Sequence, residues 1–475
     1  MLDSECTLSE KMENVEKKAR RNYFIYFAAI SVNLICFSTG IAYAWTSPLL
    51  PKFESNDPSI NPIGRPLSAS ESGLLVSVIN FGLLFGPILS GGLAGRIGKK
   101  ATLLISALPI LVAQVICIFA KSLEVFLVAR FLMGVTTGAA WSLMPGYISE
   151  ICEPKIRGAL NSLIAVFSAI GYQYTYIVGP FVSIMWFSIL NTIPALLFFI
   201  CVYFFVPDSP YDLVMKNDFQ SAEESLIRLR RKSDVKKDLI EIQRVVVANA
   251  QSHAKIMDIF KNKGSVAALI ICSALMAFNC FSGVLIVLGY TQPIFEQAGS
   301  SIPPTYSAMM VGTISLIATI LTTQLIDRLG RRPILILSSL IASLAHVSLG
   351  IFFHLQSKNV NTESFGWVPI CSVIAFMFFF NFGIAPLTWI ILGELFASNI
   401  KAVAASLCSS VNYFSAFALT AAYTYVVASI GTANTFFFFG VMMAACSLFC
   451  TFKLPETNGK TFEEIYAILN KKTGK

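Results

Sequence analysis

The chain alternates between long apolar stretches and shorter polar ones. A run of about 20 mainly apolar residues crosses the hydrocarbon core of a bilayer, and twelve such runs occur in the 475 residues. The predicted spans are residues 23–45, 73–94, 101–120, 123–148, 158–181, 183–205, 264–290, 305–326, 333–354, 367–393, 401–426 and 432–453. The pattern therefore predicts an all-α membrane protein with twelve transmembrane helices.

The twelve spans fall into two groups of six, separated by a polar segment. Apolar residues recur at helical spacing within this segment, which predicts short amphipathic helices at the membrane surface. Six spans on each side indicate a duplicated chain. The predicted parts are an N-terminal tail (1–22), an N-terminal six-helix half (23–205), a loop with short helices (206–263), a C-terminal six-helix half (264–453) and a C-terminal tail (454–475).

The basic residues indicate the orientation. Thirty of the 35 Lys and Arg residues lie in the two tails and in the loops on one side, and four lie in the loops on the other side. Under the positive-inside rule both termini are therefore cytosolic. We attribute the net charge of +8 to this topology and to contact with anionic membrane lipid, in preference to nucleic-acid binding.

Two basic motifs occupy equivalent cytosolic loops of the two halves. Residues 95–100 read GRIGKK after the second span, and residues 327–332 read DRLGRR after the eighth. Topology alone accounts for basic residues in one such loop. The recurrence of Arg-x-Gly-basic-basic at matching places supports the duplication and indicates a shared role.

A second repeat places a glutamate at the end of the fourth and tenth spans. Glu150 precedes Arg157 by seven positions, and Glu394 precedes Lys401 by the same number. A carboxylate at a helix C-terminus is unfavourable unless a cation compensates it, so we expect ion pairs with nearby bases. Such pairs would latch the cytosolic side closed, as a network because single exposed pairs contribute little. The predicted latch residues are Arg96, Glu150, Arg157, Asp327, Arg331, Arg332, Glu394 and Lys401.

The sequence carries no recognisable catalytic centre. There is no Walker loop, no zinc-ligand spacing and no nucleophile elbow, and the three histidines are scattered. We expect neither an enzyme nor a bound metal or cofactor. No Asp or Glu lies deep in a span, and proton-coupled carriers need a membrane carboxylate, so the pattern favours uncoupled transport. Arg130, within the fourth span, is compatible with capping of carbonyl groups or with a role in transport.

Polar and aromatic residues inside the spans suggest a solute path. Amides exchange hydrogen bonds with hydroxyls and aromatic rings stack on C–H faces, which together suit a neutral polyol. Asparagine in a span can also hold helices together, and for each residue both interpretations stay open. The candidate path includes Tyr172, Gln173, Asn279, Ser282, Asn381, Trp389, Asn412 and Tyr413, and the predicted substrate-binding residues are Ser168, Asn279, Ser282, Tyr290, Asn381, Trp389 and Asn412.

These motifs resemble those of the sugar porters of the major facilitator superfamily, nearest to insect facilitative trehalose or glucose transporters. The resemblance runs from about residue 23 to residue 467. It implies alternating access around a mid-membrane site, a cytosolic helical bundle and Glu/Arg latches, with Asn381, Trp389 and Asn412 lining the site. The matching segments are residues 96–100, Arg130 with Gly134, Glu150 with Pro154, 157–158, 207–210 (PDSP), 327–332, 393–394 and 455–457 (PET).

The departures from the family pattern gather at the predicted sugar site. Several polar positions of the family carry other residues, namely Ala165, Asn279, Cys280, Leu285, Ser315 and Tyr413. Because each lost hydrogen bond costs about 1 kcal/mol, affinity for a hexose would be weakened or redirected.

The sequence thus favours facilitative, uncoupled transport of a neutral sugar such as trehalose or a hexose across the plasma membrane. The alternatives are transport of another polyol or organic solute, and a sugar sensor that does not transport. The expected partners are the sugar and membrane lipid, with no obligate protein partner and no nucleic acid.

Overall fold

The computed structural model describes residues 23–232, 234–250, 256–260, 262–396, 400–460, 464–466 and 468–469, and this part of the chain forms helices and connecting loops. The first half contains α2 (Tyr23–Ala44), α3 (Thr46–Phe53), α4 (Ala69–Ile97), α5 (Lys99–Phe119), α6 (Leu123–Ile151), α7 (Arg157–Val178) and α8 (Ile184–Phe204). Between the halves lie α9 (Pro210–Met215), α10 (Phe219–Arg230), α11 (Lys236–Ala250) and α12 (Ile256–Phe260). The second half contains α13 (Lys263–Phe281), α14 (Val284–Ala298), α15 (Pro304–Leu329), α16 (Arg331–Ser357), the 3-10 turn η1 (Glu363–Phe365), α17 (Val368–Phe379), the π-helix η2 (Phe380–Ile384), α18 (Ala385–Glu394) and α19 (Lys401–Phe452).

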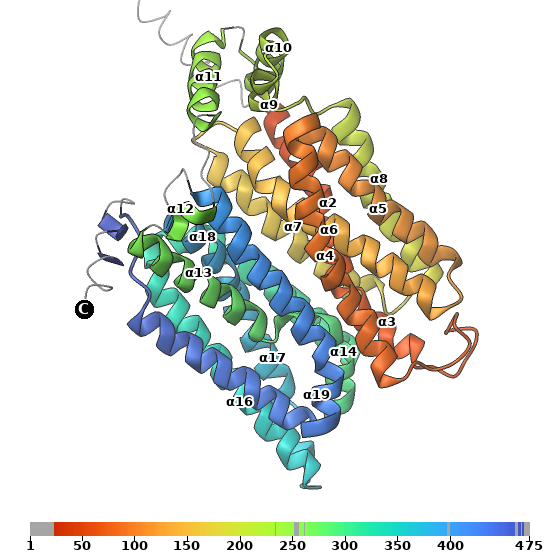
Figure 1. Cartoon of the computed structure of the whole chain (residues 1–475). Helices are drawn as coiled ribbons and strands as arrows, with labels where there is room; N and C mark the ends of the chain where they lie inside the picture. The colour runs from red at the N-terminus through yellow and green to blue at the C-terminus, as the bar shows by residue number, and fades with distance from the viewer. Residues whose placement is uncertain are drawn as a thin grey trace, which may run out of the picture.

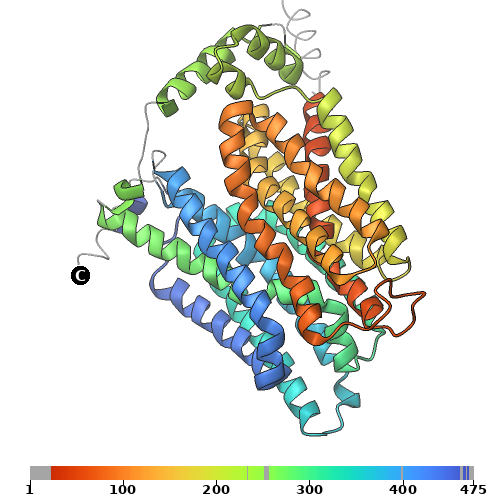
Figure 2. The ribbon, with the colours of Figure 1, turned by 45° about the vertical axis from the view of Figure 1, so that its right-hand side comes forward.

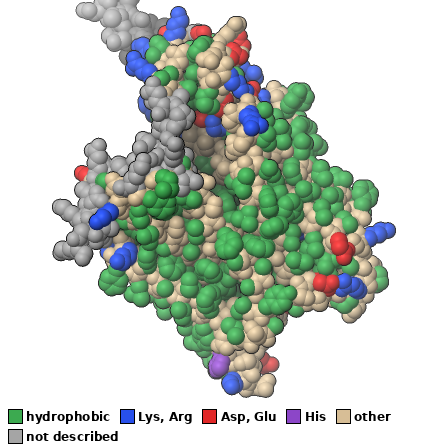
Figure 3. Space-filling view, viewed as in Figure 1, with side chains coloured by type: hydrophobic (Ala, Val, Ile, Leu, Met, Phe, Trp, Pro, Cys, Tyr) green, Lys and Arg blue, Asp and Glu red, His purple; other side chains and the backbone are tan. Residues whose placement is uncertain are grey.

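The two halves form two bundles that lie side by side, with α9–α11 across one end (Figures 1 and 2). We call this end, which carries the loops at Gly98 and Gly330, the motif end, and the opposite end, which carries residues 54–68, the loop end. On the face shown in Figure 3, hydrophobic side chains cover the surface between the ends, and charged side chains gather toward the ends. This belt confirms the prediction of a helical membrane protein.

By length and composition, ten helical segments of the described residues can cross a membrane. The longest of them, within α19, bends at Gly431, whose φ of 85° interrupts the helix. Each arm therefore corresponds to one predicted span. The remaining predicted span is α7, which carries several polar side chains and is not among the ten. Twelve crossings stay a prediction that the arms of α19 and the length of α7 support.

Small residues allow close helix contact in the first half. Gly82 of α4 lies against the backbone of α6 at Phe131, and Gly134 of α6 lies against the backbone of α4 at Ile79, so closely that a Cβ at either glycine would collide with a carbonyl oxygen. Without a hydrophobic force between helices in lipid, such close packing drives their association.

Two helices of the second half are interrupted, where hydropathy alone predicts continuous spans. Gly283, at a φ of 83°, separates α13 from α14, and His346 Nε2 donates to the freed carbonyl of Ser282 at 2.8 Å. In η2 the backbone widens to a π-helix, and Thr322 Oγ1 lies 3.1 Å from the carbonyl oxygen of Asn381. Interrupted backbone is tolerated at membrane depth where neighbouring helices satisfy it.

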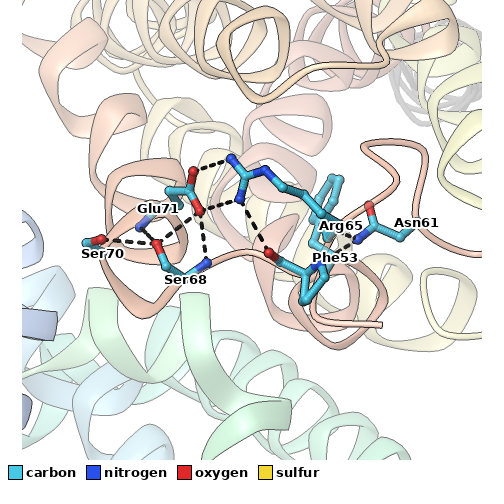
Figure 4. A network of polar contacts seen from close by, with 7 residues as sticks. Phe53, Asn61, Arg65, Ser68, Ser70 and Glu71 are labelled. Atoms are coloured by element: carbon cyan, nitrogen blue, oxygen red, sulfur yellow. Dashed lines mark hydrogen bonds and ion pairs between the residues drawn. The ribbon is translucent and has the colours of Figure 1, made fainter. Parts of the chain in front are cut away.

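At the loop end, residues 54–68 fold tightly onto the start of α4 (Figure 4). Ser68 caps α4 in a capping box with Glu71, a pairing that satisfies two free N–H groups at a helix start. Arg65 pairs with the same carboxylate at 2.5 Å. Asn61 Nδ2 donates to the carbonyl of Phe53 at 2.8 Å. The loop therefore fixes where α3 ends and α4 begins.

Helices α9–α11 enclose a small core of their own. Its buried members include Val214, Ala222 and Leu226, from α9 and α10. Ser209 caps α9 and also donates to Glu150 at 2.6 Å, which ties this bundle to the end of α6. Arg230 donates to the carbonyl of Ile151 at 2.8 Å.

Candidate substrate site and motif-end networks

A cavity of about 130 Å³ lies between the two halves. Since water occupies about 30 Å³ per molecule in the liquid, the space holds several waters or part of a solute. Its wall comes from α2, α4, α6 and α7 on one side and from α13, α14, η2, α18 and α19 on the other. The lining residues are Tyr43, Asn80, Leu83, Trp141, Tyr172, Asn279, Cys280, Val284, Leu285, Leu288, Phe380, Ala385, Trp389, Asn412, Tyr413 and Ala416.

Three buried polar atoms of residues in this wall have no hydrogen-bond partner in the part of the chain that the structure describes. They are Oδ1 of Asn80, Nε1 of Trp141 and Nδ2 of Asn279. A buried polar atom without a partner costs about 1–3 kcal/mol, so a hydrogen bond from a bound solute would offset this cost. One atom accepts and two donate, which matches a hydroxylated solute, because each hydroxyl does both.

The predicted substrate residues divide between this wall and other places. Asn279, Trp389 and Asn412 line the cavity, although the Asn412 amide also donates to the Met276 carbonyl at 3.0 Å. Tyr172 and Tyr413 of the candidate path line it too.

The other predicted substrate residues direct their polar groups elsewhere. The hydroxyls of Ser168 and Ser282 donate to the carbonyls of Cys36 and Asn279, at 3.2 and 2.7 Å. The amide of Asn381 donates to its own helix, at Met377 O. Tyr290 packs 5.0 Å from the Tyr423 ring centroid, outside the cavity wall, and Gln173 bonds to Thr313. A substrate role for these side chains stays a prediction. Local bonds supply a structural role for Ser168, Ser282 and Asn381, whereas the buried Tyr290 hydroxyl has no hydrogen-bond partner among the described residues.

Of the wall residues that carry a polar side-chain atom, sequence reasoning missed three, namely Tyr43, Asn80 and Trp141. Asn80, like Asn279, is an amide within an apolar span. The reasoning that selected Asn279 could therefore have selected Asn80 as well. Tyr43 and Trp141 carried no comparable signal, because the spans contain many aromatic residues.

Arg130 is fully enclosed in the first half. It donates to the carbonyls of Ala42 at 2.5 Å and Leu75 at 3.2 Å, and its guanidinium lies 5.3 Å from the ring centroid of Trp45. This geometry favours the capping of carbonyl groups over a role in transport, and the capping ties α2 and α4 to α6.

At the motif end of the first half, Lys99 holds two carboxylates. Its Nζ lies 2.7 Å from Glu150 Oε1 of α6 and 2.9 Å from Asp212 Oδ1 of α9. Asp212 also accepts the backbone N–H of Lys99 at 2.6 Å, which caps the first turn of α5. Gly98, at a φ of 94°, makes this turn possible.

The second half has an equivalent network around Arg331. Its Nε lies 3.4 Å from Glu394 Oε1 of α18. The second carboxylate is Glu456, which follows α19 and accepts the backbone N–H groups of Arg331 at 3.0 Å and Arg332 at 3.1 Å. Burial raises the pKa of Glu456, but backbone N–H donors, including those of residues 331, 332, 457 and 458, outweigh burial and leave this pKa below its ordinary value.

The structure places the predicted latch residues unequally. Glu150, Arg331 and Glu394 belong to the two networks. Arg332 binds backbone carbonyls at the end of α19, with Nε 3.3 Å from Cys450 O. Arg96, Arg157 and Lys401 form no ion pair with a described residue, and the Asp327 side chain lies outside the described residues. The sequence prediction omitted Lys99, Asp212 and Glu456, which make most of these contacts.

These ion pairs lie within one half or between a half and its adjoining segment. Hydrogen bonds between the halves lie in the middle and toward the loop end. They include those from Thr46 to Gly289 O at 3.1 Å, from Asn80 to Thr420 at 3.1 Å, from Gln173 to Thr313 at 2.9 Å and from Tyr176 to Leu288 O at 3.1 Å. Among described residues we find none between the halves at the motif end. The surface is hollowed there, below the α9–α11 bundle (Figure 3).

Comparison with known proteins agrees with this architecture. The family described as sugar (and other) transporter matches residues 12–469. The chain belongs to the sugar (and other) transporter family. Facilitated trehalose transporter Tret1 of Apis mellifera ligustica is 28% identical over 466 residues, 98% of this chain and 91% of that one. The protein of the same name in Polypedilum vanderplanki is 31% identical over 447 residues, 93% of this chain and 87% of that one.

Solved structures give the fold of this family member. The inward open conformation of the xylose transporter XylE from E. coli matches with a TM-score of 0.77 at 22% identity, over 94% of this chain and 99% of that chain. The proton:xylose symporter XylE bound to 6-bromo-6-deoxy-D-glucose matches with a TM-score of 0.74 at 23% identity, over 95% and 100%. The protein therefore has the major facilitator fold. Its membership of the transporter family makes it a multi-pass membrane transporter, as predicted.

Proposed function

We propose that this transporter carries a neutral sugar, such as trehalose or a hexose, across the plasma membrane by facilitated diffusion. The observation that carries the proposal is the trio of unpartnered polar atoms, from Asn80, Trp141 and Asn279, in an aromatic cavity between the halves. Aromatic faces suit the C–H face of a sugar ring, and the amides suit its hydroxyls. Relatives named as facilitated trehalose transporters support the same solute class.

The absence of ion coupling is part of the proposal. None of the lining residues within the described chain carries a carboxylate, whereas a proton-coupled site needs one to load and release the proton. Acidifying the outer solution from pH 7.5 to pH 6 should then leave initial uptake unchanged. Stimulation of uptake by the proton gradient would contradict uncoupled transport.

The motif end is proposed to face the cytosol, with both chain termini on that side, because most basic residues gather there. In this orientation the hydrogen bonds between the halves lie in the middle and toward the outer side, which supports a conformation that opens toward the cytosol. The two motif-end networks support each half as a rigid body, and the weaker contacts between the halves would break and re-form during alternating access.

The decisive experiment is uptake of radiolabelled glucose and trehalose by oocytes that express the protein at the surface. Uptake above that of uninjected cells is expected, and Trp389→Ala and Asn279→Ala should each reduce it at least tenfold. Asn434→Ala is the matched control, because that amide bonds to its own helix at Ile430 O, outside the cavity. Uptake equal to uninjected cells, with surface expression verified, would reject the proposal.

A second candidate is transport of another polyol or organic solute. It is favoured by Cys280 and Leu285, which present apolar surface to the cavity where sugar porters commonly have amides. Competition of the labelled uptake by inositol, glycerol and mannitol distinguishes the two: strong inhibition by one of them and none by glucose would favour this candidate.

A further inference from the structure

A second, larger cavity lies at the motif end, away from the proposed solute path. It is open to one side and holds about 370 Å³ between the start of α2 and the end of α10. Its lining is one aromatic residue, one aliphatic residue and three cations, namely Phe24, Ile227, Arg228, Arg231 and Lys232. The solute cavity shares none of these residues.

The two arginines are held in position around one ring. Their guanidinium carbons lie 5.9 Å (Arg228) and 5.2 Å (Arg231) from the centroid of Phe24, a distance at which a cation is attracted to an aromatic face. Arg228 also donates to the Phe205 carbonyl, at the end of α8. Arg231 adopts a left-handed conformation, with φ of 53°, where α10 ends, and this turns the chain back over the ring. The cations are therefore ordered by the fold.

These three cations are not neutralised by a carboxylate in the part of the chain that the structure describes. None of them forms an ion pair with a carboxylate of a described residue, whereas other bases of the same end do: Lys99 pairs with Glu150 and Lys100 with Asp208. Three unpaired positive charges around one cavity favour an anionic occupant that brings the missing charge. Guanidinium groups match phosphate oxygens in geometry as well as in charge.

The surface around the cavity favours an anion that also has an apolar part. The neighbouring surface of α2 and α8 is aromatic and exposed, with Tyr23, Phe27 and Phe205 71%, 42% and 50% exposed. The Phe27 and Phe205 rings meet edge to face at 6.0 Å, directly beyond Phe24, whose ring centroid lies 6.4 Å from that of Phe27. A ligand seated on the cations thus continues onto the hydrophobic belt.

We propose that this cavity binds the headgroup of an anionic phospholipid, with its acyl chains lying along α2 and α8. In the orientation proposed above, the cavity faces the cytosolic leaflet, where anionic lipids concentrate. The bound lipid would join α10 to α2 and α8, and so hold the α9–α11 bundle on the first half.

The test measures binding of a fluorescent phosphatidylinositol 4,5-bisphosphate to the purified full-length protein in phosphatidylcholine nanodiscs. Each basic residue near a membrane surface contributes roughly fivefold to binding of anionic lipid. The variant Arg228→Gln/Arg231→Gln/Lys232→Gln should therefore bind on the order of 100-fold more weakly. The matched control is Lys236→Gln/Lys237→Gln/Arg244→Gln, which removes the same charge from exposed positions of α11 and should bind within about threefold of the unaltered protein.

Two results would overturn the proposal: undiminished binding by the cavity variant, and an equal loss in both variants, which would mean that overall charge governs binding. Soluble inositol trisphosphate distinguishes a lipid from a free phosphate, because displacement at the same concentration as the lipid would reject the role of the acyl chains. If the triple variant does not fold, Arg231→Gln alone should bind roughly fivefold more weakly, and unchanged binding there would also reject the site.

Discussion

The motif-end networks of the two halves are copies that differ in the base and in the second carboxylate. In each, a glycine with positive φ precedes a base, Lys99 or Arg331, and this base pairs with a glutamate at the end of a helix, Glu150 or Glu394. In each, a second carboxylate accepts the backbone N–H of that base. The copies differ in which residue supplies it.

The second carboxylate follows the last span of its half in both cases. In the C-terminal half it is Glu456, directly after Pro455. The residue at the corresponding place of the first half is Asp208, after Pro207, yet the cap comes from Asp212, one helical turn later in α9. Asp208 instead lies 3.8 Å from Lys100, half exposed. The feature that both halves share is therefore a carboxylate that caps the helix beginning at Lys99 or Arg331. The residue that supplies this carboxylate occupies a different sequence position in each half.

Replacing Lys99 should have the largest effect of the substitutions that test this comparison. Lys99→Ala leaves Glu150 and Asp212 without their cation, and removing one partner of a largely buried ion pair costs about 3–5 kcal/mol. We expect a melting temperature lower by several degrees and uptake reduced at least tenfold. Lys100→Ala is the control, because its ion pair is long and partly exposed, and it should change stability by less than about 1 kcal/mol. Equal effects would mean that the two lysines are interchangeable.

Replacing the C-terminal cap should have the next largest effect. Glu456→Ala leaves the backbone N–H groups of Arg331 and Arg332 without an acceptor, and the loss of a helix cap costs about 0.5–2 kcal/mol. Asp208→Ala, its sequence equivalent, should change stability by less than about 0.5 kcal/mol. Thermal unfolding in detergent measures both, and a larger loss for Asp208→Ala would contradict the structural equivalence of Glu456 and Asp212.

The two helix-end glutamates should respond unequally to neutralisation. Both oxygens of Glu150 are engaged, by Lys99 at 2.7 Å and by Ser209 at 2.6 Å, whereas Glu394 has a longer contact of 3.4 Å to Arg331. Glu150→Gln should therefore reduce uptake several-fold more than Glu394→Gln, a difference of about 1 kcal/mol. Unchanged uptake kinetics in both variants, at normal surface levels, would mean that the networks play no part in the transport cycle.

The smallest expected effect is a pH dependence. Because the pKa of Glu456 in the folded protein lies below its ordinary value, its carboxylate stabilises the fold above the unfolded pKa of about 4.3, and this contribution disappears as pH falls through the folded pKa. The difference in melting temperature between the unaltered protein and Glu456→Gln should be constant from pH 7 to pH 5 and shrink below about pH 4. A difference in melting temperature that grows as the pH falls would contradict a lowered pKa of Glu456 in the folded protein.

The fold was predictable from the sequence because apolar length and basic loops report directly on the membrane. The interruptions at Gly283 and in η2 were not, because hydropathy averages over a window and both segments remain apolar. At the networks the sequence named Arg96 where the structure uses Lys99. Both bases belong to one short motif in the sequence. In the structure Lys99 is the first residue of α5 and its side chain is partly buried, whereas Arg96 lies in the last turn of α4 with an exposed side chain. Side-chain direction at such a loop depends on where the next helix begins.

The cavity shows the same limit. Asn279 and Asn381 both lie within apolar spans, and the pattern gives them equal weight. In the folded chain Asn279 reaches the cavity with an unpartnered amide, while the Asn381 amide bonds to its own helix. Which of the two occurs depends on the rotation of each helix, and spans that are apolar on all sides do not encode that rotation.

The contacts between the halves have a consequence for the speed of the carrier. The polar contacts named between the halves are neutral hydrogen bonds, such as Thr46 to Gly289 or Gln173 to Thr313, and a bond of this kind contributes only about 1 kcal/mol. Thermal motion can therefore break these bonds one after another, without the large activation barrier that separating buried charges would impose. Because the ion pairs lie within each half, opening does not have to break them, and its rate is set by the loss of single hydrogen bonds. A carrier without an external energy source can then change between its two conformations equally readily in both directions.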